Sequence, residues 1–239
     1  MLEDEVSNSL PENEAQAKKL WQRADAVCFD VDSTLCVDEM IDEFAKYLHC
    51  SEVVKLTEET MNGKISFRES LRVRLNILKP TRKQLEYFIE KREPRLTPGG
   101  EALVAELHRL RIPVYLISGS FLPMVIPVAK VLKIPEANIY ANEIFFDDSG
   151  FYIGFDETRL TSDSDSKNFG KSAVCRKLKD EKGYRNLVMI GDGVTDLEAS
   201  LHADLFIGFG GNQCREVVES KALWYVYDFD TLRTSLADE

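Results

Sequence analysis

Short apolar runs alternate with longer amphipathic stretches along this chain, a pattern typical of an α/β protein with a mostly parallel sheet. Four runs are predicted to be buried strands: Ala26–Phe29, Val114–Ile117, Leu187–Ile190 and Leu205–Ile207. Polar segments follow the first three of them, namely DVDST, SGS and GDGVTD. Because the carboxyl ends of parallel strands meet at one edge of a sheet, we expect these segments to line one crevice. Helices on both faces would complete a three-layer core.

About eighty residues separate the first two predicted strands, many more than a crossover helix needs. Residues 39–92 contain no convincing strand, but helical patterns occur at Met40–Leu48, Glu52–Met61, Phe67–Leu78 and Arg82–Lys91. We therefore expect a small helical cap over 39–92, inserted after the first strand. The α/β core would then comprise 21–38 and 93–239, and its next helix, Glu101–Leu110, follows the Pro- and Gly-containing segment 94–100.

Two further segments are predicted to lie outside this core pattern. Residues 1–20 form an acidic tail. The segment IFFDDSGFYIGF at 144–155 predicts two short strands around an Asp-Ser-Gly turn, a hairpin appended to the sheet.

Composition and charge exclude several classes of protein. The chain has 239 residues, of which 44% are hydrophobic, so it can bury a core. Its 41 acidic and 30 basic side chains give a net charge of −11, which argues against a broad surface for nucleic acid or anionic membranes. No apolar run approaches the ~20 residues that span a bilayer. We expect a small-molecule substrate, no nucleic-acid or membrane partner, and an oligomeric state that the sequence leaves open, a homodimer included.

The cysteines and the N-terminal segment predict a cytoplasmic location. Five scattered cysteines form no C-x-x-C pair and no zinc pattern, which is typical of reduced thiols in an intracellular protein. The first sixteen residues are acidic and lack the apolar stretch of a secretory signal.

The predicted cap is locally cationic, with seven basic residues and one acidic residue over 64–83. Most of these cations are expected on a solvated helix face. Arg74 differs, because helical spacing puts it on the same stripe as Phe67, Leu71 and Leu78. A guanidinium on an apolar stripe requires an anion, supplied by the protein or by a ligand.

Two aspartate motifs follow predicted strands. Asp30 and Asp32 lie two positions apart in FDVDST, where two carboxylates repel unless a cation or a proton lies between them. Asp192 and Asp196 lie one helical turn apart in GDGVTD. Either motif alone is compatible with a helix N-cap. Together, at the ends of separate strands, they favour a divalent, oxygen-ligated metal.

Two further motifs suit anion binding. Ser118, Gly119 and Ser120 lie at a strand-to-helix turn in LISGSF, and Lys171 lies near a helix start in NFGKS. The latter is not a P-loop, because Asp165 stands where that pattern needs glycine. Neither a dinucleotide fingerprint nor a serine-triad motif is present.

The order of these motifs along the chain resembles that of the haloacid dehalogenase superfamily of phosphatases. Asp-x-Asp follows the first strand, a Ser follows the second, a Lys comes later, and Gly-Asp-x-x-x-Asp follows the third. Within this superfamily, the chain resembles the phosphoserine phosphatase family from about Ala24 to Leu232. The segments that carry the resemblance are VCFDVDST, Glu39, the Met61–Phe67–Arg74 series, LTPGG, LISGSF, FGKS, MIGDGVTDLEA and FIGFGGN.

This resemblance implies a Mg²⁺-dependent phosphomonoesterase that hydrolyses O-phospho-L-serine through an aspartyl-phosphate, the last step of phosphorylated serine biosynthesis. Asp30 would be the nucleophile and Asp32 the general acid and base. Mg²⁺ would be held by the Asp30 carboxylate, the Asp32 main-chain carbonyl and Asp192. Asp196 would orient Lys171 or the groups around the metal.

The resemblance also implies a substrate site formed by both parts of the chain. Its residues would be Glu39, Met61, Asn62, Phe67, Arg74, Ser118, Gly119, Ser120, Lys171 and Thr195. Glu39 would pair with the substrate ammonium and Arg74 with its carboxylate. Met61 and Phe67 would close over the site, although both also suit a cap core. Asn62 and Ser120 stand where the family usually has glycine, so their side chains are expected to narrow the pocket or alter its hydrogen bonding.

Two other functions are compatible with part of this pattern. A phosphatase or phosphotransferase for another small phosphomonoester would share the core, and only Glu39 with Arg74 argues against it. A receiver-like domain would be a non-enzymatic phospho-acceptor that also uses Asp, Ser or Thr, and Lys at strand ends. Such a domain needs neither the long insertion nor Asp-x-Asp.

Overall fold

The computed structural model describes residues 10–50, 53, 66–164 and 168–236. The helix predicted at Glu52–Met61 falls almost entirely outside these residues, as do Met61 and Asn62. Within the described part of the chain, no helix combines the length and apolar character that crossing a bilayer requires.

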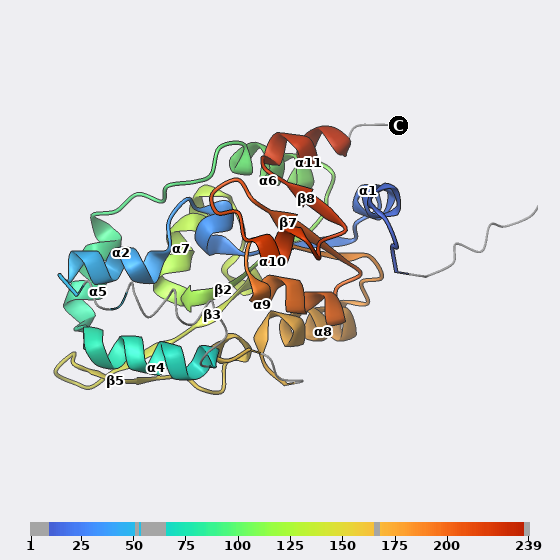
Figure 1. The fold of residues 1–239 in the computed structure, drawn as a ribbon. Helices are drawn as coiled ribbons and strands as arrows, with labels where there is room; N and C mark the ends of the chain where they lie inside the picture. The colour runs from blue at the N-terminus through green and yellow to red at the C-terminus, as the bar shows by residue number, and fades with distance from the viewer. Residues whose placement is uncertain (1–9, 51–52, 54–65, 165–167, 237–239) are drawn as a thin grey trace, which may run out of the picture.

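A six-stranded sheet forms the centre of the fold, with the order β3-β2-β1-β6-β7-β8 (Figure 1). Every neighbouring pair in it is parallel. Its strands are β1 (Ala26–Phe29), β2 (Val114–Phe121), β3 (Ile139–Asn142), β6 (Leu187–Gly191), β7 (Leu205–Phe209) and β8 (Trp224–Val226). The four predicted strands are confirmed, whereas β3 and β8, the short strands at the two edges of the sheet, were not predicted.

Helices cover both faces of this sheet, so the predicted three-layer α/β core is confirmed (Figure 1). Val27 and Phe29 of β1 face one layer, while Ala26 and Cys28 face the other, as the two-residue period of a strand requires. The first layer contains α1 (Glu14–Gln22), α6 (Gly100–Arg109), α7 (Leu122–Val131) and α11 (Phe229–Ser235). The second contains α8 (Gly170–Lys182), α9 (Val194–Leu197) and α10 (Glu216–Glu219).

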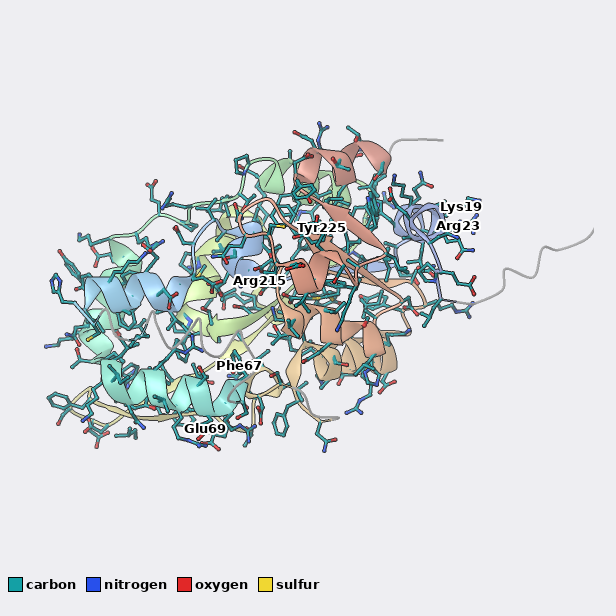
Figure 2. All side chains as sticks on the ribbon, viewed as in Figure 1. Lys19, Arg23, Phe67, Glu69, Arg215 and Tyr225 are labelled. Carbon is teal, nitrogen blue, oxygen red and sulfur yellow. The ribbon has the colours of Figure 1, made fainter. Side chains whose placement is uncertain are left out.

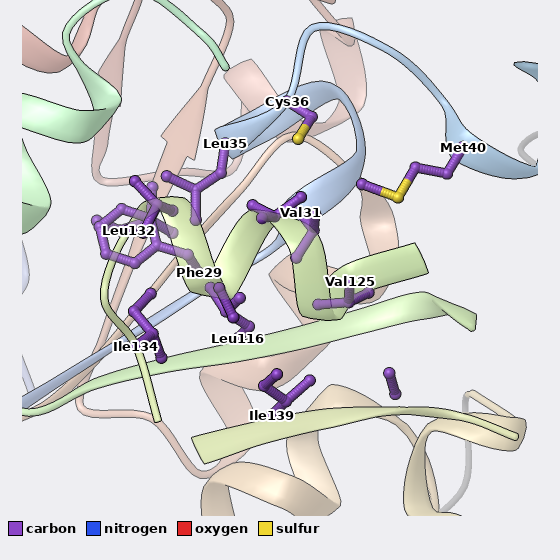
Figure 3. Close-up of a cluster of buried hydrophobic side chains, with 14 of the residues drawn as sticks. Phe29, Val31, Leu35, Cys36, Met40, Leu116, Val125, Leu132, Ile134 and Ile139 are labelled. Atoms are coloured by element: carbon purple, nitrogen blue, oxygen red, sulfur yellow. The ribbon is translucent and has the colours of Figure 1, made fainter. Parts of the chain in front are cut away.

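The larger apolar cluster lies between the sheet and the first helix layer. Phe29, Leu116 and Ile139 from three neighbouring strands meet Val125 and Leu132, at and just beyond α7 (Figure 3). Their burial holds β1 and β2 rigidly side by side, with Phe29 level with Leu116 and also with Ile190 of β6. The three strands therefore deliver their following residues to the same sheet edge.

In the part of the chain that the structure describes, α2 (Met40–Tyr47), α4 (Phe67–Leu78) and α5 (Arg82–Glu90) lie between β1 and α6. The predicted bounds of α4 are confirmed; its first turn is capped by the Ser66 hydroxyl, which accepts a hydrogen bond from the Glu69 N–H (3.2 Å). Thr81 and Gln84 form a capping box at the start of α5. Further short helical turns occur at Val31–Leu35, Glu136–Asn138, Leu160–Ser162 and Glu198–Leu201.

The hairpin near 144–155 forms, but it is not an extension of the main sheet. β4 (Ile144–Phe146) and β5 (Tyr152–Phe155) make a separate two-stranded antiparallel sheet. It contacts the inserted helices instead: Thr81 bridges to Phe151, and the Arg82 guanidinium lies 5.1 Å from the Phe146 ring centroid. The expectation of a hairpin appended to the sheet is corrected, because these contacts hold it under α4 (Figure 1).

Candidate active site

The polar segments that follow β1, β2 and β6 meet at one edge of the sheet. The Asp30 N–H donates to the Ile190 carbonyl (2.9 Å), which fixes the end of β1 against β6. Across β2, the Ser118 hydroxyl donates to Asp32 Oδ2 (3.0 Å). The Thr34 hydroxyl donates to Asp192 Oδ1 (3.2 Å). The structure thus brings together the three strand-end motifs, although they lie up to 158 positions apart in the chain.

Asp30, Asp192 and Asp196 form a buried carboxylate cluster in which one oxygen of each lies within 4.8 Å of the others. Burial, followed by the nearby Asp30, raises the pKa of Asp192 to about 6 against the opposing effect of Arg215. Burial also raises the pKa of Asp196 well above its ordinary value, with Asp30 contributing in the same direction. These shifts reflect carboxylates that lack solvent and repel one another, so the cluster favours a bound cation.

Lys171 is the cation that the protein itself supplies to this cluster. Its Nζ lies 2.5 Å from Asp30 Oδ1 and 2.5 Å from Asp196 Oδ1. Burial lowers the pKa of Lys171, but Asp196 and Asp30 outweigh that effect and raise it above its ordinary value. Lys171 is therefore charged, and its position near the start of α8 adds the helix dipole to its attraction for anions.

Asp196 occupies its position because Gly191 has no side chain. A Cβ on Gly191 would lie 2.2 Å from the Asp196 Cγ, a distance that no packing arrangement permits. The Gly193 N–H donates to Asp196 Oδ2 (3.0 Å), which fixes the carboxylate orientation. Thr195 lies half-buried beside it at the start of α9. The glycines on either side of Asp192 therefore allow the carboxylate cluster to form, in addition to permitting the turn.

The Asp32 side chain points away from the cluster and toward β2. Its Oδ1 accepts from the Met40 N–H (2.7 Å), and the hydroxyls of Ser118 and Ser120 also donate to the carboxyl. Burial and the neighbouring Asp30 raise the pKa of Asp32 to about 6, while these hydrogen bonds limit the rise. A carboxyl with this pKa can both give and take a proton near neutral pH.

Arg74 and Phe67 reach this edge from α4. Arg74 is only 6% exposed and faces Asp42, Glu39 and Asp32; burial lowers its pKa, and the three carboxylates oppose the effect. Phe67 lies at the end of α4 nearest the sheet (Figure 2), with its ring directly over Gly119. A Cβ on Gly119 would come within 2.8 Å of the Phe67 Cζ. The inserted helices are therefore closed over the sheet edge.

Arg215 joins the two parts of the site and was not predicted. Its Nε lies 2.9 Å from Asp192 Oδ2, and a terminal nitrogen lies 3.6 Å from Glu39 Oε1. Glu39 also accepts from the Ser33 hydroxyl (2.8 Å), and burial followed by Asp32 and Asp192 raises its pKa to about 8. The available signal was weak: Arg215 is the lone base between Asp204 and Lys221, shortly after the FIGFGGN segment.

Asn212 is the last residue of that segment, and the resemblance implied no role for it. Its side-chain amide lies within hydrogen-bond distance of the Ser33, Thr34 and Cys36 carbonyls and donates to Thr97 Oγ1 (2.6 Å). Thr97 in turn donates to the Thr34 carbonyl (2.6 Å). Asn212 thus holds the turn that follows Asp30 and Asp32.

The donor set and the charge balance both fit a divalent metal. The carboxylates at this edge are Asp30, Asp32, Glu39, Asp42, Asp192 and Asp196, and the cations facing them are Lys171, Arg74 and Arg215. If all of these groups are ionised, three negative charges remain, and a bound divalent cation would reduce this excess. Carboxylate and carbonyl oxygens are also the ligands that Mg²⁺ prefers.

Comparisons with known proteins agree with this geometry. Residues 24–204 match the family model described as haloacid dehalogenase-like hydrolase. The chain is 43% identical to human phosphoserine phosphatase over 225 residues, which cover 94% of this chain and 98% of that protein. It is 46% identical over 220 residues to the chloroplastic phosphoserine phosphatase of Arabidopsis thaliana, covering 91% and 73% of the two chains.

A solved structure gives the same result at the level of the fold. A substrate-bound phosphoserine phosphatase complex aligns with a TM-score of 0.72 and 26% identity, covering 86% of this chain and 94% of that one. The chain therefore belongs to the haloacid dehalogenase-like hydrolases and, within them, to the phosphoserine phosphatase family.

Proposed function

We propose that this protein hydrolyses O-phospho-L-serine to L-serine and phosphate, with Mg²⁺ as its metal. The observation that carries the proposal is the buried Arg74, held with Glu39 over a carboxylate cluster that contains Lys171. The cluster suits phosphoryl transfer, whereas a buried cation and a carboxylate beside it suit the two charged groups of an amino acid. The names of the two relatives, phosphoserine phosphatase, point to the same substrate.

Asp30 is the proposed nucleophile. It attacks phosphorus, the bond to the serine oxygen breaks, and an aspartyl-phosphate forms on the Asp30 carboxylate. Lys171, 2.5 Å from Asp30 Oδ1, holds that carboxylate in place and would bind a phosphoryl oxygen. A water molecule then attacks phosphorus and releases phosphate.

Asp32 is the proposed general acid and base. Its pKa of about 6 allows a protonated fraction near neutral pH, which can protonate the departing serine oxygen. The ionised carboxylate then accepts a proton from the hydrolytic water. The hydrogen bonds from the Met40 N–H and the Ser118 hydroxyl keep the carboxyl oriented toward the substrate space above β2.

Asp30, Asp192 and the Asp32 carbonyl would hold Mg²⁺, with Asp196 fixed close by and bound to Lys171. Bound Mg²⁺ supplies positive charge that offsets the repulsion between the anionic site and the anionic phosphoryl group. Arg215, which lies beside Asp192 and Glu39, balances the remaining carboxylates.

The rest of the substrate would lie between the sheet edge and the inserted helices over 39–92, which we propose act as a cap. Arg74 would bind the carboxylate and Glu39 the ammonium. Ser118, Gly119 and Ser120 would contact phosphoryl oxygens, with Thr195 a lesser contact. Phe67 would exclude water, and the same role is proposed for Met61, whereas the Asn62 side chain would narrow the pocket or alter its hydrogen bonding. The sequence resemblance alone supports the roles of Met61 and Asn62.

Phosphate release from L-phosphoserine, D-phosphoserine and phosphothreonine, each with and without Mg²⁺, tests the function. We expect metal-dependent release with a preference for L-phosphoserine. Asp30→Asn should abolish both turnover and trapping of the aspartyl-phosphate, and turnover retained in that variant would refute the mechanism. Equal release from all substrates would instead indicate a phosphatase for other small phosphomonoesters.

Arg74→Ala separates substrate recognition from chemistry. Because Arg74 would bind only the amino-acid carboxylate, hydrolysis of phosphoserine should fall far more than hydrolysis of an aryl phosphate. Arg72→Ala is the matched control, since Arg72 is on the same helix but its side chain is 47% exposed. Equal losses on both substrates in Arg74→Ala would contradict the carboxylate role.

Location and assembly follow as separate proposals. We expect a cytoplasmic protein, and cell fractionation tests this because one relative is named chloroplastic. Size-exclusion chromatography with light scattering tests whether the protein is a monomer or a homodimer.

A further inference from the structure

The site is closed to molecules the size of an amino acid. Asp30, Asp32, Lys171 and Arg74 are each between 6% and 8% exposed, and the Phe67 ring covers Gly119. A phosphorylated amino acid cannot reach Asp30, and its product cannot leave, unless the helices above the sheet edge move. We call α2, α4 and α5 together the lid.

The lid is joined to the core at one end. The two connecting segments run side by side there: the Val37 N–H donates to the Arg95 carbonyl (3.0 Å). Asp38 forms ion pairs with both Arg92 and Arg95 across the same two segments. Rotation about this double connection would swing the first turn of α4 away from the sheet edge. The start of α5 also contacts the hairpin, through the bridge between Thr81 and Phe151 and through the Arg82 N–H, which donates to the Gly150 carbonyl (2.8 Å). The contacts of the first turn of α4 and those of α5 therefore together decide how long the lid stays closed.

Arg68 makes most of the contacts of the first turn of α4. A terminal nitrogen donates to the Ser162 hydroxyl (3.0 Å) and to the Glu157 carbonyl (3.1 Å). The Nε lies 3.5 Å from both the Ser162 carbonyl and Asp163 Oδ2. The guanidinium also lies 4.5 Å from the Phe169 ring centroid. Arg68 therefore connects the lid to residues up to 101 positions away by hydrogen bonds, an ion pair and a cation–π contact.

We propose that Arg68 is the latch of the lid: its contacts with Glu157, Ser162, Asp163 and Phe169 hold α4 closed over the candidate site. The proposal rests on the proposed function only in that it places a phosphorylated substrate beneath the lid. Phe67 and Arg68 are consecutive residues, so the ring reaches Gly119 in the same movement that brings the guanidinium to Ser162 and Phe169. Both contacts form on closing and break on opening.

The latch also joins the lid to the segment that carries Lys171. Phe169 immediately precedes α8, and Lys171 is the second residue of that helix. Lid closure therefore stacks Arg68 against the chain just before the cation proposed to bind the phosphoryl group. Arg68 is a positioning residue in this scheme, because it acts through Phe67, Ser162 and Phe169 and does not touch the reacting atoms.

Arg72 provides a matched control on the same helix. It forms one ion pair with Glu157 Oε1 (2.8 Å), with side chains 47% and 46% exposed, whereas the Arg68 side chain is 21% exposed. Exposed pairs of this kind contribute little in water. Arg68 uses the Glu157 backbone carbonyl, so loss of the Arg72 side chain leaves the contacts of the latch in place.

Steady-state kinetics of phosphoserine hydrolysis give the first test. In Arg68→Ala we expect KM to rise about tenfold with kcat within about twofold of the parent, because less of the protein is closed on the substrate. Arg68→Lys keeps the charge but loses the planar guanidinium, so we expect KM to rise about threefold in this variant. Arg72→Ala should match the parent. A fall in kcat at unchanged KM, or equal effects of Arg68→Ala and Arg72→Ala, would overturn the proposal.

A distance measurement tests the latch without activity. Spin labels on Val73→Cys in α4 and Leu201→Cys on the core would be introduced with Cys50 and Cys214 replaced by serine; positions 73 and 201 are 37% and 77% exposed. Arg68→Ala should add a longer-distance population that the parent and Arg72→Ala lack. An unchanged distribution would refute the latch even if phosphoserine is hydrolysed. If the parent does not hydrolyse phosphoserine, the proposed function fails while this measurement still decides the latch.

Discussion

Gly119→Ala should obstruct lid closure without disturbing the fold. A Cβ at position 119 would lie 2.8 Å from the Phe67 Cζ and 3.0 Å from its Cε2. Carbon atoms in contact prefer a separation of about 3.5–4.0 Å, so the ring has to retreat by roughly 1 Å. Gly119 is not among the glycines with positive φ, so alanine fits its backbone conformation. The conflict therefore arises only when the lid is closed.

The size of the effect follows from this overlap. Extra carbon atoms in a packed interior cost about 1–3 kcal/mol. Here the obstructing Phe67 ring belongs to the lid, which can move, so we expect a cost near the lower end of this range. A cost of about 1.4 kcal/mol in the free energy of lid closure corresponds to a tenfold change in the closing equilibrium. We therefore expect kcat/KM for phosphoserine to fall about tenfold. The free energy of unfolding should change by less than about 1 kcal/mol, because alanine suits a strand better than glycine.

A double-mutant cycle isolates the contact between position 119 and the ring. kcat/KM and urea unfolding are measured for the parent, Gly119→Ala, Phe67→Ala and the double variant. Phe67→Ala is itself expected to lower kcat/KM, because the site loses its cover. With the ring absent, Gly119→Ala should have an additional effect of less than about twofold, since no atom remains for the Cβ to meet.

The reasoning would be refuted if Gly119→Ala lowered kcat/KM equally in both backgrounds. That result would mean that the new methyl group disturbs the strand-end backbone or the phosphate position directly. A large loss of folding stability in Gly119→Ala alone would also contradict it, because the overlap would then be present in every folded molecule.

Three further predictions concern the carboxylate cluster and the turn beside it. Gly191→Ala would place its Cβ 2.2 Å from the Asp196 Cγ. The affinity for Mg²⁺, measured by calorimetry, and the turnover should therefore both fall by about a hundredfold or more. Gly193→Ala is the control and should lose much less of both, because its Cβ would lie 3.2 Å from the nearest atom of Asp196. Asn212→Ala should reduce the free energy of unfolding by about 1–3 kcal/mol and lower kcat, because buried carbonyls lose their donor; unchanged urea unfolding would contradict this. The pKa of Asp192 is raised to about 6 in the fold, so the metal-free protein gains stability as the carboxyl is protonated below that pH and loses it as the pH rises through 6. Mg²⁺ competes with that proton, so the rise in Tm on adding Mg²⁺ should be larger at about pH 7.5 than at about pH 5, and equal shifts would argue against binding at this cluster.

Elements with a strong local period were predicted closely. The bounds of β1 and α4 agree with the prediction residue for residue, because a continuous apolar run and a 3.6-residue stripe are properties of neighbouring residues. β3 has only four residues and ends in Asn142, so its signal was weak, whereas β8 lies in the apolar run ALWYVY at 222–227 and was missed although a local signal was present. The hairpin formed as predicted, yet it pairs as a sheet of its own and contacts Thr81 and Arg82 at the start of α5.

The sequence by itself determined the fold class and the chemistry of the strand-end motifs, because both depend on short segments whose period and residue types can be read locally. Only the tertiary structure decided how those motifs are completed: that Arg215 links Asp192 to Glu39, that Asn212 holds the turn after Asp30, and that Arg68 contacts Ser162. The last two contacts join residues 179 and 94 positions apart. Such contacts depend on how loops and side chains pack once the sheet has formed, and no local pattern records that packing.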